Sequence, residues 1–399
     1  MNNKKYIIIG NSAAGIAAIR TLRSLDPRAT IICYSDEEES PYNKCFLADY
    51  ISGDKSEADT YTLKKEQLDQ LSIYMRYGTA VVGVNAQERY ITLKNGARES
   101  YDALLVATGT RPFWPNIEHI GSYSNVFAFH NLKSAQQLSL FIEKRKPQKA
   151  VVIGAGLSGV EIADALTRHN IEVHLVERGG HLLSAHLTAQ ASQFLERAMS
   201  HSGVYIHTNR TVVSVEGSAD IAQRVILSDG TVVKTDLIIV TAGLIRNVEL
   251  ACNAGLSVDQ YGLEVNEYLQ ASDQYIYAAG DIISTVDQIS GKVMASCTWP
   301  DAMQQGRYAA YAMAGQPKQY SGASIITSSA FFGLKFYSCG AKDDTKFTVV
   351  EQNNDHFYRL YLLQGDKLKG FILLDDGKKF AQLRAALLTG QPVNNQLLD

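Results

Sequence analysis

The fold is decided by the stretch Ala150-Val151-Val152-Ile153-Gly154-Ala155-Gly156-Leu157-Ser158-Gly159. Its four leading apolar residues are typical of a buried strand, and its three glycines keep the G-x-G-x-x-G spacing of a dinucleotide-binding turn. An apolar helical pattern continues to about Asn170, and the next strand is expected at residues 172–176. A strand, a glycine turn, a helix and a second strand in this order predict a βαβ unit with a parallel sheet.

The same plan occurs near the N-terminus. An apolar strand pattern at residues 6–9 leads into Gly10-Asn11-Ser12-Ala13-Ala14-Gly15, then into a helical pattern to about Leu25 and a strand at 30–34. Each copy is also followed by a later apolar strand that ends in a glycine, at residues 101–109 and 235–243. The sequence therefore predicts two nucleotide-binding units built on one plan.

The C-terminal region has a different pattern. Residues 347–350, 357–363 and 368–374 predict antiparallel strands, and residues 378–388 predict a closing helix. We therefore predict an α/β fold with two Rossmann-like dinucleotide-binding domains and a small α+β C-terminal domain. The expected boundaries are 1–116 and 246–320 for a discontinuous first dinucleotide-binding domain, 117–245 for the second domain and 321–399 for the small domain.

The composition excludes several classes of function. The 399 residues carry a formal net charge of -3 and no basic stripe, so we expect no nucleic-acid partner. No apolar run reaches the ~18 residues that a membrane span needs, so we expect no membrane insertion. Five cysteines are scattered without metal-ligand spacing, which predicts no metal site and indicates a reducing cytoplasm.

The first glycine turn is expected to bind a pyrophosphate through backbone N–H groups at a helix N-terminus. Gly10 permits the tight turn and Gly15 permits close helix–strand packing. Ser12 replaces the middle glycine and offers a hydroxyl to the phosphate. Ala13 and Ala14 are the other candidate cofactor-binding residues of this turn. Asp36 is the candidate acid for the ribose hydroxyls, although the run of residues 36–39 also suits a solvated acidic loop. A glycine turn without a ligand is the alternative interpretation.

The second turn keeps all three glycines, Gly154, Gly156 and Gly159. Glu177 closes the following strand, where a carboxylate accepts hydrogen bonds from both ribose hydroxyls and repels a 2′-phosphate. This pattern favours NADH over NADPH. Arg178 stands beside Glu177 and could pair with a 2′-phosphate, so NADPH stays open as the weaker alternative.

With these residues in place, the chain resembles the pyridine nucleotide-disulfide oxidoreductase superfamily, the flavoproteins with two dinucleotide-binding domains, over roughly residues 5–320. The resemblance implies that the first unit holds FAD and the second NAD(P)H. It implies that Asp281, in Ala-Ala-Gly-Asp, bonds the flavin ribitol and that Ala302 starts a helix facing the pyrimidine end of the flavin. It also implies cofactor contacts for a further set: Val81, Ala107, Thr108, Gly109, Arg111, Leu157, Gly243 and Gly280.

The segment 40–53 bears on which branch of the superfamily the chain resembles. It holds a single cysteine, Cys45, where disulfide reductases carry Cys-x4-Cys, and no His-Pro pair follows near the C-terminus. A dithiol mechanism is therefore excluded, because a second thiol and a base are both missing. The Pro-Tyr-Asn-Lys run ending at Lys44 is similar to NADH:rubredoxin and ferredoxin reductases and to the flavoprotein part of nitrite reductases. That resemblance implies a Lys44–Glu161 pair near flavin N5.

A competing branch contains single-cysteine NADH oxidases, NADH peroxidases and coenzyme A-disulfide reductases. The residues from Cys45 to Gly53 resemble the stretch around their reactive cysteine, although Phe46 and Ala48 replace its Gly and Pro. In that branch Cys45 would cycle between thiol and sulfenic acid or mixed disulfide. A small apolar filler beside the flavin is the alternative role for this cysteine.

We therefore expect an FAD-dependent enzyme that takes hydride from NADH and passes electrons to a small redox protein such as rubredoxin or ferredoxin. A small-molecule oxidant reached through Cys45 is the second expectation. A flavoprotein redox sensor without fast turnover is the third. The sequence leaves a homodimer open.

Overall fold

The computed structural model describes residues 3–324, 326–342 and 344–398. The chain forms two compact units, each assembled from three segments. Unit 1 comprises residues 1–45, 60–111 and 245–325, and unit 2 comprises residues 46–59, 112–244 and 326–399. Residues 46–59 and the C-terminal region thus belong to unit 2, and the three domain boundaries expected from the sequence stay a prediction.

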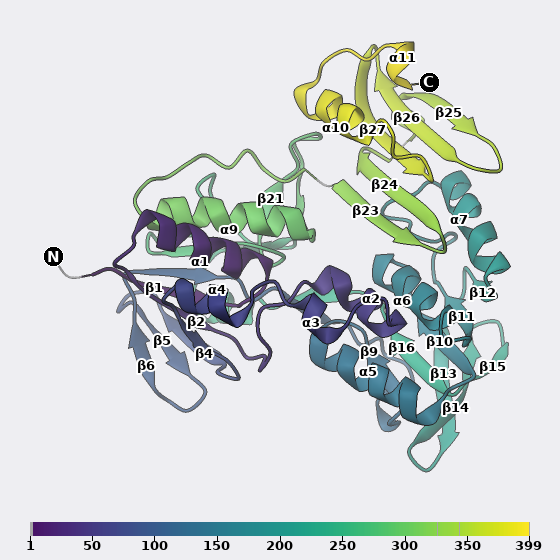
Figure 1. Cartoon of the computed structure of the whole chain (residues 1–399), viewed down its shortest axis with the longest axis horizontal. Coiled ribbons are helices and arrows are strands. Elements are labelled where there is room, and N and C mark those ends of the chain that lie inside the picture. The colour runs from purple at the N-terminus through teal and green to yellow at the C-terminus, as the bar shows by residue number, and fades with distance from the viewer. Residues whose placement is uncertain (1–2, 325, 343, 399) are drawn as a thin grey trace. The chain divides into compact units, whose positions relative to one another are not determined.

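Unit 1 is built on a five-stranded parallel sheet in the order β20-β7-β1-β2-β3. Its central strands are buried because both faces are covered, which explains their continuous apolar sequence. Two long helices, α1 and α9, lie side by side over the sheet (Figure 1). The bounds are β1 Lys5–Ile9, α1 Ala13–Leu25, β2 Thr30–Tyr34, β3 Tyr74–Arg76, β7 Ala103–Val106, β20 Ile276–Ala278 and α9 Trp299–Met313.

Short elements complete unit 1. An antiparallel sheet of β4, β5 and β6 contributes the buried Ile91 to the core. These elements are β4 Val81–Asn85, β5 Tyr90–Leu93, β6 Arg98–Ser100, α4 Lys65–Gln70, α8 Glu249–Asn253, β18 Val258–Asp259, β19 Gly262–Leu263, β21 Ser284–Val286 and β22 Val293–Ala295. At the junctions with unit 2 lie η1 Lys44–Phe46, α3 Glu57–Thr60, β8 Thr110–Pro112 and β17 Leu244–Arg246.

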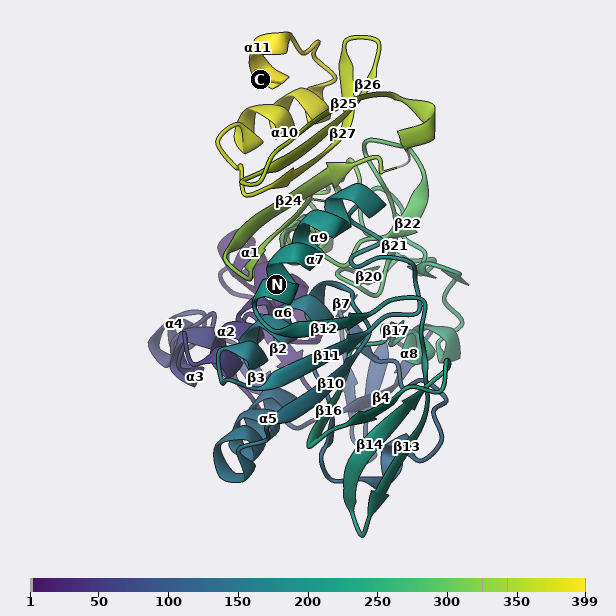
Figure 2. The same cartoon turned by 90° about the vertical axis from the view of Figure 1, so that its right-hand side faces the viewer.

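Unit 2 repeats the plan with a parallel sheet in the order β12-β11-β10-β16-β9 (Figure 2). An antiparallel sheet of β13, β14 and β15 packs its apolar residues against this sheet. The bounds are α2 Leu47–Ser52, η2 Ile120–Ser122, β9 Val126–Ala128, α5 Leu132–Arg145, β10 Lys149–Ile153, α6 Leu157–Thr167, β11 Glu172–Val176, α7 Ala189–His201, β12 Val204–His207, β13 Val212–Ser218, β14 Ile221–Leu227, β15 Val232–Lys234 and β16 Leu237–Val240.

The C-terminal part of unit 2 is a five-stranded antiparallel sheet in the order β23-β24-β27-β26-β25. Three of its strands and the helix α10 fall where the sequence predicts them, while the hairpin of β23 and β24 was not predicted. Its turn uses positive φ angles at Phe332 and Gly333, and only the glycine favours that conformation. The bounds are β23 Ile326–Phe331, β24 Leu334–Gly340, η3 Asp344–Lys346, β25 Thr348–Asn353, β26 Tyr358–Gln364, β27 Lys367–Leu374, α10 Phe380–Thr389 and α11 Asn395–Leu398.

One helix begins earlier than expected. The sequence places the start of the flavin-facing helix at Ala302, whereas α9 begins at Trp299. The side chain of Thr298 accepts a hydrogen bond from the backbone N–H of Asp301, and Pro300 occupies the first turn, where its missing N–H costs nothing. Within the described residues, no helix combines the length and apolar character needed to cross a membrane.

The crossing of α1 and α9 gives a stability prediction. A Cβ atom added at Gly306 would lie 2.1 Å from the backbone oxygen of Ala14. Gly306→Ala should therefore lower the free energy of unfolding by about 2 kcal/mol, although alanine usually favours a helix. Chemical denaturation measures the change. Gly121→Ala is the control because a Cβ there meets open space, and an equal or more stable Gly306→Ala protein would contradict the close crossing.

Candidate functional site

The first glycine turn, between β1 and α1, is fixed by close backbone contacts. Gly10 has a φ of +111°, and its N–H donates a hydrogen bond to the Tyr34 oxygen at 2.8 Å. A Cβ at Gly10 would lie 2.1 Å from the Ala107 oxygen, and one at Gly15 would lie 1.9 Å from the Gly10 oxygen. Both positions therefore require glycine.

The N-terminus of α1 is suited to an anion. Ser12 is the N-cap residue, but its side chain makes no capping hydrogen bond, and no acidic residue lies in the first turn. Among the other helices of ten or more residues, α5, α7 and α9 are capped by the side chains of Asn131, Thr188 and Thr298, while α6 and α10 are uncapped like α1. Because the first N–H groups of a helix need acceptors, the uncapped end of α1 fits a pyrophosphate.

The second glycine turn, between β10 and α6, has the same geometry. A Cβ at Gly154 would lie 2.5 Å from the Thr241 oxygen, and one at Gly159 would lie 1.9 Å from the Gly154 oxygen. At Gly156, however, a Cβ would meet nothing within 4 Å. Gly156 is also the N-cap of α6 and offers no side-chain cap. Packing thus explains the outer glycines, and the middle one leaves space on the side where a dinucleotide would bind.

Glu177 lies beside this second turn. Its two carboxylate oxygens accept hydrogen bonds from the Ala155 N–H at 2.8 Å and the Gly179 N–H at 2.7 Å. The carboxylate is therefore held in one orientation next to the turn, and a carboxylate oxygen can accept a further donor. Arg178 is exposed. The assignment of Glu177 to the ribose of NADH fits this placement and stays a prediction.

Three elements of unit 1 meet around Gly280. Gly280 has a φ of +86°, and its N–H donates to the buried Gln305 side chain at 2.8 Å. A Cβ at Gly280 would lie 3.3 Å from the Cβ of Ala14 and 3.9 Å from the Cβ of Ala302. The first turns of α1 and α9 therefore lie close to Gly280, and this brings together three residues that the sequence assigns to FAD.

Asp281 follows directly. Burial raises the pKa of its carboxyl group, and the positive charges of Lys44 and Arg246 oppose that effect. Among the described residues, none donates a hydrogen bond to this carboxylate. A buried acceptor without an internal donor fits the hydroxyl-rich ribitol chain that the family resemblance assigns to it.

Lys44 and Cys45 lie in η1, at the end of the first segment of unit 1. Cys45 is exposed, and its backbone N–H donates to the Asn43 side chain at 3.0 Å. Lys44 lowers the pKa of Asp281 and of Glu37 through its charge. The positive charge of Lys44 thus acts on both of these acidic groups of unit 1.

Glu37 is an acid next to Asp36 that the sequence analysis did not single out, and the assignment of Asp36 to the ribose stays a prediction. Asp36 is exposed, whereas Glu37 is half-buried and accepts a hydrogen bond from the Tyr42 hydroxyl at 2.7 Å. Burial raises the pKa of Glu37, and the charge of Lys44 and the bond from Tyr42 lower it. The acidic run offered no local signal to choose between the two, because only the tertiary contact with Tyr42 distinguishes them.

The residues after β7 form hydrogen bonds and an ion pair with the start of the third segment of unit 1, residues 245–325. Thr108 exchanges two hydrogen bonds with Asn247, at 3.0 and 2.8 Å. Arg111 donates to Asn247 at 2.9 Å and forms an ion pair with Glu249 at 2.6 Å. These contacts hold Gly109, which has a φ of +62°, in place. Arg111 and Val81, the first residue of β4, keep cofactor roles only as predictions.

Glu161 lies on α6 and faces the C-terminal sheet. Its carboxylate accepts a hydrogen bond from the Ser329 hydroxyl of β23 at 2.7 Å. Burial raises the pKa of Glu161 to about 7; the bond from Ser329 lowers it and the charge of Asp49 raises it. Lys44 belongs to unit 1 and Glu161 to unit 2, so the expected pair between them stays a prediction. Gly243 and Leu157 flank the second turn in unit 2.

Two further residues of unit 1 escaped the sequence analysis. The Arg246 guanidinium lies 3.9 Å from the sulfur of Cys297, a cysteine whose backbone is accessible but whose thiol is largely enclosed, just before the start of α9. Burial of the thiol and the charge of Asp281 raise the pKa of Cys297 to about 11, against the lowering effect of Arg246. Neither residue carries a spacing signal in the sequence. Across residues 3–324, 326–342 and 344–398, no cluster of His, Cys, Asp or Glu could hold a metal ion.

A family model described as pyridine nucleotide-disulphide oxidoreductase matches residues 4–306. The chain is 27% identical over 399 residues to the assimilatory nitrate reductase electron transfer subunit of Bacillus subtilis, covering 99% of this chain and 50% of that protein. It is 28% identical to putidaredoxin reductase of Pseudomonas putida, covering 99% of this chain and 94% of that protein. The chain thus spans half the length of the first relative and nearly all of the second.

Two crystal structures have the same fold over nearly the whole chain. Reduced CoADR-RHD from Bacillus anthracis has a TM-score of 0.93 at 25% identity, covering 98% of this chain and 75% of that chain. The covalent putidaredoxin reductase–putidaredoxin complex has a TM-score of 0.92 at 26% identity, covering 100% and 96%. These likenesses confirm the predicted fold class of two Rossmann-like domains with a small C-terminal domain.

The pKa of Glu161 gives a pH prediction. A carboxyl with a raised folded-state pKa contributes stability that is full below its unfolded value of 4.5 and is lost as pH rises toward about 7. Between pH 5 and 8 the wild type should therefore lose on the order of 2 kcal/mol relative to Glu161→Gln. Unfolding free energies at several pH values measure this difference.

Ser329→Ala is the matched variant. It removes the hydrogen bond that lowers the pKa of Glu161, so the loss of stability should extend to higher pH. Equal pH dependence in the wild type and Glu161→Gln would contradict the raised pKa.

Proposed function

Because the chain belongs to the pyridine nucleotide-disulphide oxidoreductase family, whose members are FAD-dependent NAD(P)H oxidoreductases, we propose that it is an NADH-dependent flavoenzyme. FAD would bind at the first glycine turn and NADH at the second. Bound FAD would accept hydride from NADH and pass electrons to a small redox protein such as a rubredoxin or ferredoxin.

One observation carries the proposal. Two glycine turns of the same geometry each lead into a helix whose N-terminus no side chain caps. Each end offers backbone N–H donors and the positive end of a helix dipole to one pyrophosphate. Two such sites in one chain suit one cofactor that stays bound and a second that enters and leaves.

The charged residues of each unit support the redox role. In unit 1 the positive charge of Lys44 would stabilise negative charge on neighbouring groups. The carboxylate of Asp281 would accept hydrogen bonds from a polyol chain. In unit 2 the Glu161 carboxyl, with a pKa of about 7, would hold or release a proton near neutral pH. Pairing with Lys44 would favour its ionised form.

Glu177 supports NADH as the nucleotide. Its carboxylate is already held by two backbone N–H groups beside the second turn, so it could not turn away from a 2′-phosphate at low cost. Repulsion between these two anions would weaken NADPH binding. The exposed Arg178 is the group through which NADPH could still bind.

A small redox protein is the preferred acceptor because of the likeness to putidaredoxin reductase, which covers nearly the whole length of both proteins. A second candidate rests on Cys45. This thiol is exposed at the start of η1, and CoADR-RHD shares the fold, so a route through a single cysteine to a small oxidant is the alternative. A homodimer and a cytoplasmic location stay predictions.

Gly156→Val tests whether NADH binds at the second glycine turn while FAD binds at the first. A Cβ at this position meets nothing within 4 Å, so the fold and the FAD content should be unchanged. The rate at which NADH bleaches the flavin absorbance should fall about 100-fold, because the nicotinamide would be displaced. Gly121→Val, also in open space in unit 2, is the control. A colourless protein that takes up no added FAD would contradict the proposal.

Cys45→Ser separates the two candidate routes. The protein-acceptor route predicts that the variant reduces rubredoxin or ferredoxin with a kcat within about twofold of the wild type. The single-cysteine route predicts loss of peroxide or disulfide reduction by a factor of at least about 100. Steady-state kinetics with each acceptor decide between them. Flavin bleaching by NADH in the same samples confirms that the first half-reaction is intact.

A further inference from the structure

Arg246, the last residue of β17, carries a guanidinium that the protein leaves almost without partners. Its Nε atom is buried and forms no hydrogen bond with any residue that the structure describes. The Cys297 sulfur, 3.9 Å from Nη2, is the only described side chain that this guanidinium contacts as a donor. The neighbouring Arg111 differs, because its guanidinium donates to Asn247 and pairs with Glu249. Arg246 thus keeps several N–H groups for a further partner.

A buried donor without a partner needs an explanation. The group has lost its hydrogen bonds to water and has gained none inside the protein, and this penalty is larger for a charged group than for a neutral one. Native structures keep few such groups, and many of them meet a ligand or have a functional role. The Nε atom of Arg246 therefore indicates an acceptor that is present when the protein is loaded.

Arg246 lies near two groups that the family resemblance assigns to the flavin. Its neighbour Cys297 directly precedes Thr298, the N-cap of α9, and α9 is the helix expected to face the pyrimidine end of the isoalloxazine ring. Asp281 is the acid expected to bond the ribitol chain. Burial raises the pKa of Asp281 and of the Cys297 thiol, and the charge of Arg246 opposes both shifts. The guanidinium therefore acts where the ring and its ribitol chain are expected.

The start of α9 itself offers little to an anion. Pro300 has no N–H group. The N–H of Asp301 donates to the Thr298 hydroxyl at 3.3 Å, and the N–H of Ala302 donates to the Thr298 backbone oxygen at 3.0 Å. Asp301 also places a buried carboxylate in the first turn, which opposes the positive end of the helix dipole. Negative charge on a ligand at this end would therefore need a second source of positive potential.

The charge of Arg246 is not neutralised by its acidic neighbours. The Asp301 carboxylate accepts hydrogen bonds from the hydroxyl groups of Ser296 and Thr298 at 2.6 and 2.9 Å. Burial raises the pKa of the Cys297 thiol to about 11, so this thiol is protonated at neutral pH. No carboxylate in the described part of the chain forms an ion pair with the Arg246 guanidinium. The full positive charge is therefore available to a ligand.

We propose that Arg246 is a flavin-binding residue whose guanidinium donates to the pyrimidine carbonyl edge of the isoalloxazine and stabilises the negative charge of the reduced ring. The inference rests on the proposed function and adds a residue to its site. Hydride transfer from NADH moves two electrons and one proton and leaves NAD⁺, so the neutral oxidised ring gains one negative charge. A fixed cation at that edge would favour the reduced ring over the oxidised one and so raise the midpoint potential.

Spectroelectrochemical titration of the FAD-loaded protein tests the proposal. Arg246→Met removes the charge and keeps a long side chain. It should weaken the binding of reduced FAD about tenfold more than that of oxidised FAD, which lowers the two-electron midpoint potential by about 30 mV. Arg246→Lys keeps the charge and should recover at least half of that shift.

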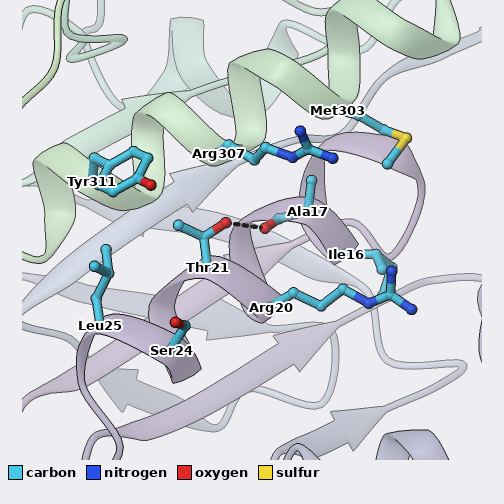
Figure 3. A pocket seen from close by; sticks show the side chains of 9 residues that line it. All are labelled: Ile16, Ala17, Arg20, Thr21, Ser24, Leu25, Met303, Arg307 and Tyr311. Carbon is cyan, nitrogen blue, oxygen red and sulfur yellow. Dashed lines mark hydrogen bonds between the residues drawn. The ribbon is translucent and has the colours of Figure 1, made fainter.

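Arg307→Met is the matched control. Figure 3 shows Arg307 with Met303 and Tyr311 on the flank of α9 that lines a groove beside α1, and Arg307 is exposed there. The substitution removes the same charge from the same helix, but from a position where water and salt screen it. The midpoint potential should stay within a factor of two in the binding ratio, or about 9 mV, of the wild type.

The rate of FAD release on dilution, followed by flavin fluorescence, gives a second measurement that does not depend on turnover. Arg246→Met should release oxidised FAD at most about threefold faster than the wild type, because the oxidised ring is neutral. Release that is tenfold faster or more, with an unchanged potential, would place Arg246 at a part of FAD whose charge does not change on reduction, such as the pyrophosphate. That result would overturn the assignment to the ring.

Other results would also overturn the role of Arg246. These are an unchanged midpoint potential in Arg246→Met, equal shifts in Arg246→Met and Arg307→Met, or a potential in Arg246→Lys as low as in Arg246→Met. In each of these cases NADH-dependent bleaching of the flavin in the wild type would leave the proposed function standing. A wild-type protein that binds FAD but is not bleached by NADH would instead remove the proposed function itself.

Discussion

The structure depends on one backbone contact that occurs twice. The oxygen of Gly10 lies where a side chain at Gly15 would begin, and the oxygen of Gly154 lies where one at Gly159 would begin, both at 1.9 Å. This approach brings each helix onto its strand with its N-terminus pointing out of the turn. The same contact therefore sets the packing of both units and leaves both sets of helix N–H groups available to phosphate.

The glycine turns and the central strands could be predicted because their signals are local. The apolar runs of β1 and β10 and the glycine spacing each identify one element without knowledge of the rest. Ser329 shows why other features could not be predicted, since it acts on Glu161 from 168 residues further along the chain. The hydrogen bond from Tyr42 to Glu37 and the contact of Arg246 with Cys297 depend in the same way on residues that are brought together only by the fold.

The two candidate acids, Asp281 in unit 1 and Glu161 in unit 2, differ in what surrounds them. Asp281 is buried near two cations and accepts no bond from a described side chain, so its environment suits a neutral polyol donor. Glu161 is buried beside a hydroxyl and a carboxylate, and its pKa moves to about 7. The family resemblance implied a role beside the cofactor for both, but only burial and neighbouring charge distinguish a hydrogen-bond acceptor from a group that exchanges protons near neutral pH.

The interleaving of the two units has a consequence for synthesis on the ribosome. The central sheet of unit 2 uses strands from β9 to β16 and is complete once residue 240 has emerged. The sheet of unit 1 begins at residue 5 but lacks β20 and the covering helix α9 until residue 313. The central sheet that starts first is therefore completed after the other one, and its apolar strands must wait some tens of seconds, at roughly 5–20 residues per second, for the segment that covers them. Chaperone binding to nascent chains should accordingly concentrate on β1, α1 and β7.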